Sequence, residues 1–374
     1  MICRGCHEET GDEVLVDLGS QPLANSLVNT KNTSEPVYPL RPVICKNWHC
    51  RLIQLPELPS DITPFTEDYP YRSGQSESWK THLLGLLEVL NPRAGQVVVD
   101  VGGNDGTLGT LLPPGVGYLN FDPSADPGQP ENRVIALTEE EGEYYGGRAD
   151  YVVALNVMAH VPDLDDFLAG IRTVMKDDGL LTVEVQDANQ MIVKGEWDCI
   201  YHEHYSYFNA QTLSDALERR GFFVERVVDI PTHGGSLRAY VRKNLQVDHP
   251  LHRTPLRIMK PYPKWPFSDG LSDQAGMCID WVTEGKRVVG YGAPAKAMTW
   301  LNAYDVRLEC IMDSTPEKIG KFTPGSSHIP IVAPNLAWLA SSDIVVILAW
   351  NWLSEVLPKI PEGPEVWARG ERLR

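Results

Sequence analysis

The chain has 374 residues, enough for two or three domains, and its 33 basic and 50 acidic residues give a formal net charge of −17. This acidic balance argues against a nucleic-acid-binding protein, which would show a basic excess, but allows a small anionic ligand held by local cations. Apolar residues at 43% are typical of a globular chain, and no apolar run reaches the roughly 18 residues of a membrane-spanning helix. With no recognisable export signal, we expect a cytoplasmic protein.

The seven cysteines are expected to be reduced, because their number is odd and no export signal accompanies them. Four of them form two pairs with the spacings of a tetrahedral zinc site: Cys3, Cys6, Cys45 and Cys50. Residues 1–60 contain few apolar residues apart from a strand-like patch at 14–18, so a bound metal would supply the missing stability. We therefore predict a zinc-binding domain over 1–60. Two alternatives remain open, namely two reduced pairs without metal and ligation by His49, which precedes Cys50.

An alternation of strands and helices follows a connector rich in Pro and Tyr at 61–75. Helices are predicted over 76–91, 107–112, 164–175 and 213–220. Strands are predicted over 96–101, 118–121, 133–137, 150–156, 180–185, 222–228 and 236–242. This order indicates an α/β fold with a doubly wound, mostly parallel, Rossmann-like sheet over 61–243, whose last two strands pair antiparallel at one edge.

A second, smaller Rossmann-like α/β domain is predicted over 244–374. It begins with a linker at 244–272 that is rich in Pro and basic residues. The pattern then predicts a helix over 273–283, a further helix after the turn at 290–296, and strands over 287–291, 308–312 and 342–349.

The first candidate site is the glycine-rich turn Gly102-Gly103-Asn104-Asp105-Gly106, which joins a strand to a helix. Such turns let a ligand approach the backbone, and the helix N-terminus offers free N–H groups. Asp105 would repel a phosphate, so a cationic ligand such as S-adenosylmethionine fits better. The next strand ends at Asp122, where a carboxylate commonly accepts hydrogen bonds from a ribose. The alternative is a purely structural turn beside a surface carboxylate.

Two further motifs carry candidate chemistry. The segment Tyr201-His202-Glu203-His204 lies after the strand at 180–185 and is dense in proton-transfer groups, although a polar surface turn is the alternative. Its two histidines lack the spacing of a helical zinc hydrolase motif. The turn at 290–296 ends in Lys296, which suits a phosphate. Because this turn lacks the dinucleotide fingerprint, a nicotinamide-dependent oxidoreductase is a weak alternative.

Together these motifs resemble the three-domain C-methyltransferases that act on nucleotide-linked deoxysugars. The resemblance spans nearly the whole chain and is most specific at 201–204, 234–238, 290–296 and 323–325. The chain departs from the family pattern at the Cys45-x4-Cys50 spacing, at Gly103, where Ser is common, and at Asp122, where Glu is common. The resemblance implies an S-adenosylmethionine-dependent methyltransferase domain over 61–243 and a substrate-binding domain over 244–374.

The resemblance also implies a reaction and a set of site residues. The substrate would be a nucleotide-diphosphate 4-keto-6-deoxysugar, methylated at C3 through an enolate. His204 would be the base, Glu203 would orient it or contact the sugar, and Tyr201 would donate to the enolate oxygen. The cofactor-binding residues would be Tyr71, Ser73, Gly102, Asn104, Asp105, Asp122, Pro123, Asn156 and His160. The substrate-binding residues would be His202, Ser236, Arg238, Tyr291 and Lys296.

The expected cofactors are therefore S-adenosylmethionine and a structural zinc, and the expected partner is the keto sugar, with no nucleic acid and no membrane. The chain would be a monomer or a small homo-oligomer. Whether Tyr69 or Tyr71 contacts the cofactor stays open. The rival functions are an O-methyltransferase, a C-methyltransferase for another nucleotide-linked molecule, and a non-catalytic zinc-containing binding protein.

Overall fold

The computed structural model describes residues 1–31, 33–59, 62, 65, 69, 72–129, 131–245, 262 and 270–374. The chain divides into two compact units, and neither is continuous in sequence. Unit 1 comprises Met1–Glu13, Val43–Ala188 and His204–Pro261. Unit 2 comprises Val14–Pro42, Asn189–Glu203 and Tyr262–Arg374. Among the described residues, no helix is both long enough and apolar enough to cross a membrane.

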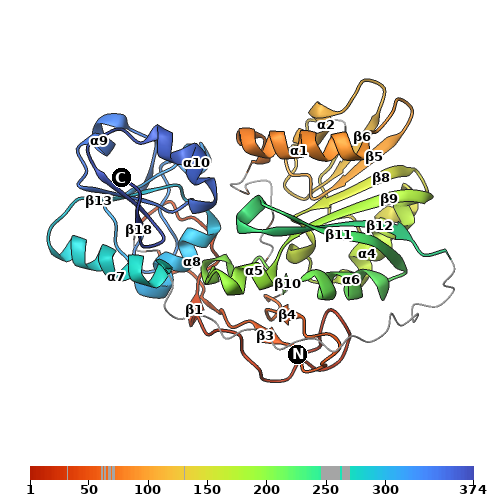
Figure 1. Ribbon diagram of the computed structural model, residues 1–374, viewed down its shortest axis with the longest axis horizontal. Helices are drawn as coiled ribbons and strands as arrows, with labels where there is room; N and C mark the ends of the chain where they lie inside the picture. The colour runs from red at the N-terminus through yellow and green to blue at the C-terminus, as the bar shows by residue number, and fades with distance from the viewer. Residues whose placement is uncertain are drawn as a thin grey trace. The chain divides into compact units, whose positions relative to one another are not determined.

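Unit 1 is built on a seven-stranded sheet of order β11-β12-β9-β8-β5-β6-β7 (Figure 1). The five strands from β9 to β7 are parallel, and β12 pairs antiparallel with both β9 and β11. The strand bounds are β5 Val97–Val101, β6 Gly117–Phe121, β7 Asn132–Arg133, β8 Ala149–Leu155, β9 Met175–Gln186, β11 Phe222–Ile230 and β12 Ser236–Lys243. This arrangement confirms the predicted doubly wound α/β sheet with an antiparallel edge.

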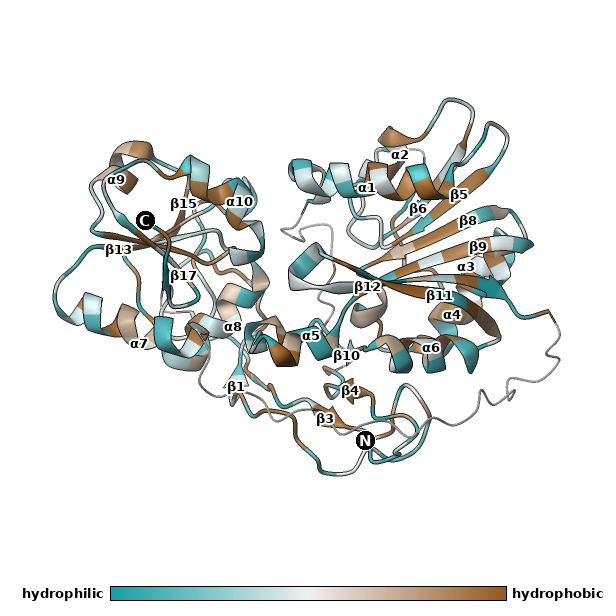
Figure 2. Cartoon of the chain, viewed as in Figure 1, coloured by the Kyte–Doolittle hydropathy of each residue, from teal (hydrophilic) through white to brown (hydrophobic). Residues whose placement is uncertain are grey.

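Helices cover both faces of this sheet because each has one apolar side. On one face α1 (Glu77–Leu90) packs with α2 (Thr107–Leu111). On the other face lie α4 (Leu164–Val174) and α6 (Ala210–Glu218), and α3 (Glu139–Tyr144) contacts α4. Figure 2 shows that the central strands β5, β8 and β9 are the apolar layer between them.

Helix α1 illustrates how the local sequence sets these bounds. Ser76 caps its N-terminus by accepting a hydrogen bond from the backbone N–H of Trp79, and Asn91 ends it in the left-handed conformation with φ of 50°. The helix therefore occupies the predicted range almost residue for residue. The prediction was wrong after α4, where β9 starts at Met175 and not at residue 180. It was also wrong at 133–137, because β7 covers Asn132–Arg133 and only one residue of the predicted range lies in it.

The cysteine-containing segment of unit 1 adds a small sheet of order β10-β4-β3, with bounds β3 Val43–Ile44, β4 Ile53–Gln54 and β10 Ser206–Tyr207. Its residues Cys3, Cys45 and Leu52 belong to the same apolar core as α4 and α6. The predicted strand-like patch at 14–18 is not a regular strand. It makes separate backbone hydrogen bonds to residues 40 and 42, in unit 2.

Unit 2 contains a six-stranded sheet of order β15-β14-β13-β16-β17-β18, parallel except for its last pair. The strands are β13 Val288–Tyr291, β14 Ile311–Met312, β15 Ile331–Val332, β16 Ile344–Ile347, β17 Glu365–Ala368 and β18 Glu371–Arg372. The helices are α5 Ala188–Val193, which begins on the last residue of a unit 1 segment, and α7 Gly270–Thr283, α8 Ala295–Tyr304, α9 Leu336–Ala340 and α10 Leu353–Val356. A two-stranded sheet pairs β1 Ser20–Gln21 with β2 Tyr38–Pro39. The second, smaller Rossmann-like sheet is thereby confirmed.

Candidate active site and metal centre

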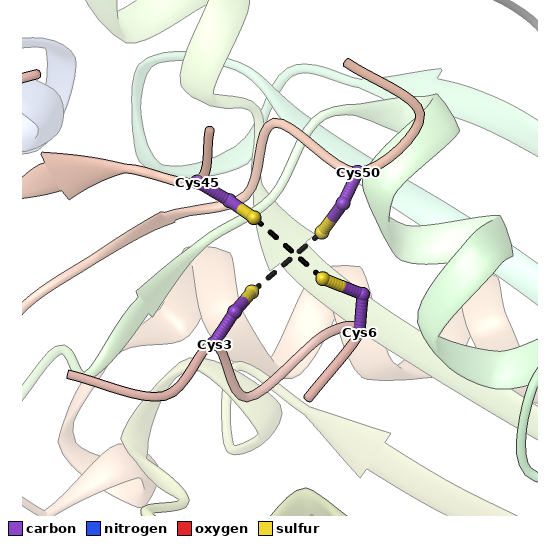
Figure 3. A group of neighbouring side chains, drawn as sticks. All are labelled: Cys3, Cys6, Cys45 and Cys50. Atoms are coloured by element: carbon purple, nitrogen blue, oxygen red, sulfur yellow. Dashed lines mark hydrogen bonds between the residues drawn. The ribbon is translucent and has the colours of Figure 1, made fainter. Parts of the chain in front are cut away.

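The four N-terminal cysteines converge on one point in unit 1 (Figure 3). Their sulfur atoms all lie within 4.8 Å of one another, with Sγ–Sγ distances of 3.7 Å between Cys3 and Cys50 and 3.6 Å between Cys6 and Cys45. A tetrahedral zinc with Zn–S bonds of about 2.3 Å places its sulfur ligands about 3.8 Å apart, so the four thiols fit this metal. His49 is not part of the group, so the geometry favours four cysteine ligands over ligation by His49.

The neighbourhood of Cys3 suits a metal-bound thiolate. The side-chain amide of Gln54 donates a hydrogen bond to its sulfur at 3.0 Å, and hydrogen bonds from Cys45 and Cys50 lower the pKa of Cys3. Such contacts around a metal ligand orient it and tune its charge. None of the seven cysteines forms a disulfide.

The glycine-rich turn after β5 holds Asp122 at the end of β6. The backbone N–H of Asn104 donates to Asp122 Oδ2 at 2.8 Å, and the N–H and hydroxyl of Ser124 donate to Oδ1 at 2.7 and 2.6 Å. Gly102 has a φ of 73°, and a Cβ there would lie 2.6 Å from Val157, so only glycine fits. Pro123 follows directly, and the turn fixes the carboxylate at the carboxyl edge of the sheet.

The carboxylate of Asp105 is hydrogen-bonded to other residues of the same chain. It accepts hydrogen bonds from the Ser73 hydroxyl and the Gly74 N–H, both at 2.8 Å, and from the Thr107 hydroxyl at 2.6 Å. The amide oxygen of Asn104 accepts the Ser73 N–H at 3.0 Å. The turn thereby anchors the short 3-10 helix η1 (Ser73–Gln75). Of the predicted cofactor residues, Tyr71 lies outside the described residues.

Sequence reasoning missed a buried acid under this turn. Asp100, on β5, is only 4% exposed and accepts a hydrogen bond from the hydroxyl of Tyr118 at 2.9 Å. Burial, with smaller contributions from the charges of Asp122 and Asp105, raises the pKa of Asp100 to about 7, although the hydrogen bond from Tyr118 acts in the other direction. The signal was one aspartate inside the apolar strand Val97–Val101.

Two predicted site histidines meet in unit 1. The ring of His204 lies edge-on to that of His160, with 4.5 Å between centroids, and Tyr207 is 5.7 Å from His204. His160 lies in the 3-10 helix η2 (Met158–His160), just after β8. Asn156, the first residue beyond β8, is held at φ of 56° with its N–H on the carbonyl of Glu184. The carboxyl end of β8 thus presents Asn156 and His160 on one short segment.

The neighbouring residues of the His204 motif belong to unit 2. Glu203 is 1% exposed, and the side-chain amide of Asn25 donates to both of its oxygens at 2.9 and 2.7 Å. His202 is hydrogen-bonded through Nε2 to the carbonyl of Tyr38 at 3.0 Å, and burial lowers the pKa of its imidazole. Tyr201 is half-buried. Asn25 is a contact that no spacing in the sequence indicates.

Arg238 is engaged within unit 1. Its Nε donates to Glu184 Oε1 at 2.5 Å and its Nη2 lies 3.2 Å from His82, which in turn lies 2.8 Å from the other oxygen of Glu184. Glu184 is fully buried, so Arg238 and His82 supply its balancing groups. Ser236 donates its hydroxyl to the carbonyl of Thr232 at 3.0 Å. Sequence reasoning did not identify Glu184 or His82.

Lys296 and Tyr291 lie in unit 2, where β13 leads through a glycine turn into α8. The Lys296 ammonium is buried, has no hydrogen-bond partner among the described residues, and lies 3.6 Å from the ring centre of Trp350. Burial lowers its pKa, although the charges of Cys199, Asp198 and Glu196 act in the other direction. Burial also raises the pKa of Tyr291.

Three family models match consecutive parts of the chain. They are a zinc binding domain over residues 3–61, a methyltransferase domain over 71–227 and a C-methyltransferase C-terminal domain over 272–367. The C-methyltransferase NovU of Streptomyces niveus is 29% identical over 395 aligned residues, which cover 95% of this chain and 91% of NovU. These matches define a C-methyltransferase with three domains.

Solved structures similar to this chain include two methyltransferases. The 1,6-didemethyltoxoflavin-N1-methyltransferase of Burkholderia thailandensis, solved with S-adenosylhomocysteine, is 19% identical, with coverage of 52% of this chain and 96% of its own and a TM-score of 0.37. A SAM dependent methyltransferase from Aquifex aeolicus is 16% identical, with coverage of 42% and 88% and a TM-score of 0.34. The three family models and the match to NovU, and not these structures, support the assignment of this chain as an S-adenosylmethionine-dependent C-methyltransferase with a zinc-binding segment and a small-molecule substrate.

Proposed function

We propose that this enzyme methylates C3 of a nucleotide-diphosphate 4-keto-6-deoxysugar. The proposal rests on the sequence resemblance to sugar C-methyltransferases, and the observation that best supports it is His204 beside His160 near the carboxyl end of β8. A ketone at C4 acidifies the hydrogen on C3, and an imidazole titrates near neutrality, so His204 is suited to remove it. Carbon alkylation needs such a base, since the attacking electron pair comes from a C–H bond.

The chain's own residues would divide the reaction as follows. His204 takes the C3 proton, the C–H electron pair becomes an enolate, and Tyr201 donates a hydrogen bond to the enolate oxygen at C4. Glu203 orients the base or contacts the sugar. S-adenosylmethionine, when bound, would supply the methyl group for the new C3–CH3 bond, and breaking of its S–CH3 bond would leave a neutral thioether. The proton on His204 then passes to solvent.

Cofactor binding is proposed for the edge of the unit 1 sheet. Among the residues that the structure describes, Oδ2 of Asp122 accepts one hydrogen bond, so a lone pair is available there for a ribose hydroxyl. Ser73, Gly102, Asn104 and Asp105 shape the surrounding turn. Asn156 and His160 lie at the end of the adjacent strand. The local excess of carboxylates suits a sulfonium cation.

For the diphosphate we propose Lys296 with Tyr291, and not Arg238. Glu184 already balances the guanidinium of Arg238, whereas the Lys296 ammonium has no hydrogen-bond acceptor among the described residues. His202 and Ser236 remain further substrate contacts in this proposal. The three domains over 1–60, 61–243 and 244–374 would then bind zinc, cofactor and substrate in that order.

Solvent exchange tests the enolate directly. In D2O without S-adenosylmethionine, the wild-type enzyme should replace the C3 hydrogen of the keto sugar with deuterium, and His204→Asn should lose this exchange. The same variant should reduce turnover by about 10²–10⁴ while calorimetry shows unchanged cofactor binding. His7→Asn is the matched control, because His7 is exposed and pairs with Asp165. An O–CH3 signal in the product, or exchange that survives in His204→Asn, would reject the proposal.

A further inference from the structure

Arg4 lies between two of the zinc-binding cysteines, and its side chain points away from them into the unit. It is 7% exposed, and its guanidinium donates to three backbone carbonyls. Nη1 donates to Leu55 at 2.7 Å and to Tyr205 at 3.2 Å, and Nε donates to Pro162 at 3.0 Å. The same group lies 5.2 Å from the centre of the Tyr205 ring. One side chain therefore joins three segments that are far apart in sequence.

Two of these segments carry the paired histidines. Tyr205 is the residue after His204, and Pro162 is two residues after His160. The segments also touch each other directly, because the N–H of Tyr205 donates to the carbonyl of Ala159 at 2.8 Å. Arg4 thus holds the backbone close to both His160 and His204, whose ring centroids are 4.5 Å apart.

The third segment is Leu55, which directly follows strand β4 and so connects Arg4 to the small sheet. β4 pairs antiparallel with β10, the strand that starts two residues after His204. The N–H of Leu55 donates to the carbonyl of Tyr205 at 3.0 Å, so this carbonyl receives both a backbone and an Arg4 hydrogen bond. The position of the His204 segment therefore depends on β4 and on Arg4 together.

The backbone of Arg4 is in turn fixed by the metal site. Its N–H donates to the side-chain oxygen of Gln54 at 3.0 Å, and the amide of Gln54 donates to the sulfur of Cys3 at 3.0 Å. Arg220 donates to the carbonyl of Arg4 at 2.7 Å. Because Cys3 and Cys6 flank Arg4, a metal bound by both fixes the direction from which its side chain leaves.

We propose that Arg4 is a positioning residue that couples the zinc site to the histidine pair, so that the metal sets the geometry of His204. Burying a guanidinium is costly unless its donors are satisfied. Here Nε and Nη1 donate to carbonyls of the two histidine segments and of Leu55, and Nη2 lies 3.6 Å from the carboxylate of Glu57. Lysine has no planar fork and cannot reach these three acceptors with the same geometry. The mechanistic part of this inference rests on the proposed function of His204.

The test compares Arg4→Met with Arg51→Lys. Arg51 is an equally buried arginine of the same zinc-binding segment, 2% exposed, and its guanidinium donates to both oxygens of Glu13 at 2.6 and 2.8 Å. Zinc content, the imidazole NMR signals of His160 and His204, and kcat and KM are measured for both variants. Arg4→Met should keep its zinc, shift both imidazole signals and lower kcat about 10–100-fold with little change in KM, as expected for a displaced base. Arg51→Lys should leave the signals and kcat unchanged.

Two results would overturn the inference. One is a folded Arg4→Met variant with unshifted imidazole signals, and the other is an equal shift in Arg51→Lys, which would indicate general destabilisation. If Arg4→Met does not fold, gradual zinc removal from the wild-type enzyme by a chelator replaces it, and the His204 signal should move before the strands of the large sheet exchange their amide hydrogens. The imidazole signals report the coupling even if His204→Asn remains active, so failure of the proposed function is distinguishable.

Discussion

The ionisation of Asp100 should make the stability of unit 1 depend on pH, because its carboxyl has a different pKa in the folded and unfolded states. In the unfolded chain its carboxyl has an ordinary pKa of 3.8, whereas burial raises the pKa to about 7 in the folded protein. Between these values the folded state holds one proton more than the unfolded state. The stability from this group is therefore present below pH 4 and is lost as the pH rises through 7. At about 1.4 kcal/mol per pH unit, the difference of about three units is worth about 4 kcal/mol.

Asp100→Asn removes this proton linkage while keeping an oxygen for the Tyr118 hydroxyl, which lies 2.9 Å from the carboxylate. In moderate urea between pH 4.5 and 7.5, hydrogen exchange of the β5 and β8 amides should show stability falling with pH in the wild type and a flatter dependence in the variant.

The matched control is Glu196→Gln in unit 2, since burial also raises the pKa of Glu196 to about 7. It should flatten the pH dependence only for unit 2 peptides. Parallel pH curves for wild type and Asp100→Asn would refute the reasoning, because they would mean that Asp100 is ionised throughout.

Three further predictions follow from the turn and the metal site. Gly102→Ala should lower the stability of unit 1 by about 1–3 kcal/mol in urea unfolding, since φ is 73° and the new Cβ would meet Val157; Gly95→Ala, with φ of 85° and open space, should show only the smaller backbone cost. Gln54→Leu should weaken zinc binding about 10–100-fold in a chelator competition, because Cys3 loses its donor. Asp122→Ala should weaken S-adenosylmethionine binding in calorimetry, and an unchanged affinity would reject the ribose contact.

Local patterns in the sequence predict much of this fold. The periodicity of apolar residues, the helix-ending residues and the glycine-rich turns predict the two α/β sheets. The spacings of the cysteines predict the metal centre. The errors concern strand length. β9 begins at Met175 because Met175 pairs with Ala149 of β8, and after an irregularity the pairing with β8 resumes over residues 180–184. β9 also pairs with β12 over residues 181–186, and its own residues do not reveal either partner. The identity of the fourth zinc ligand likewise required the geometry, since His49 and Cys50 are adjacent.

The charged residues of the site were harder to predict because a charge in a sequence does not show its partner. Arg238 and Glu184 are 54 residues apart and meet only because β12 lies beside β9. Asp105 is satisfied by Ser73 and Gly74, about 30 positions upstream. Arg4 has the same property on a larger scale, since it reaches Tyr205 across 201 positions. Groups like these become visible only when the topology brings distant segments together.

In each of the two sheets an aspartate that follows a strand accepts backbone hydrogen bonds from a glycine-rich turn, but the two aspartates have different neighbours. Asp313 in unit 2 accepts the N–H of Ala293 from the glycine turn at 2.6 Å and the N–H of Thr315 at 2.8 Å, as Asp122 accepts those of Asn104 and Ser124 in unit 1. A carboxylate directly after the second strand of such a sheet therefore stabilises the glycine-rich turn, whether or not it also binds a ligand.

Asp122 and Asp313 differ in the charges of their neighbours. We expect this difference to decide which of the two carboxylates can also bind a cationic cofactor. Asp122 has the carboxylates Asp100 and Asp105 around it, whereas the ammonium of Lys318 lies 4.0 Å from Asp313. A cationic cofactor is attracted to the first arrangement and gains less from the second. Asp313→Ala should therefore leave S-adenosylmethionine affinity unchanged while Asp122→Ala weakens it. Equal losses in the two variants would mean that both carboxylates act only through the fold.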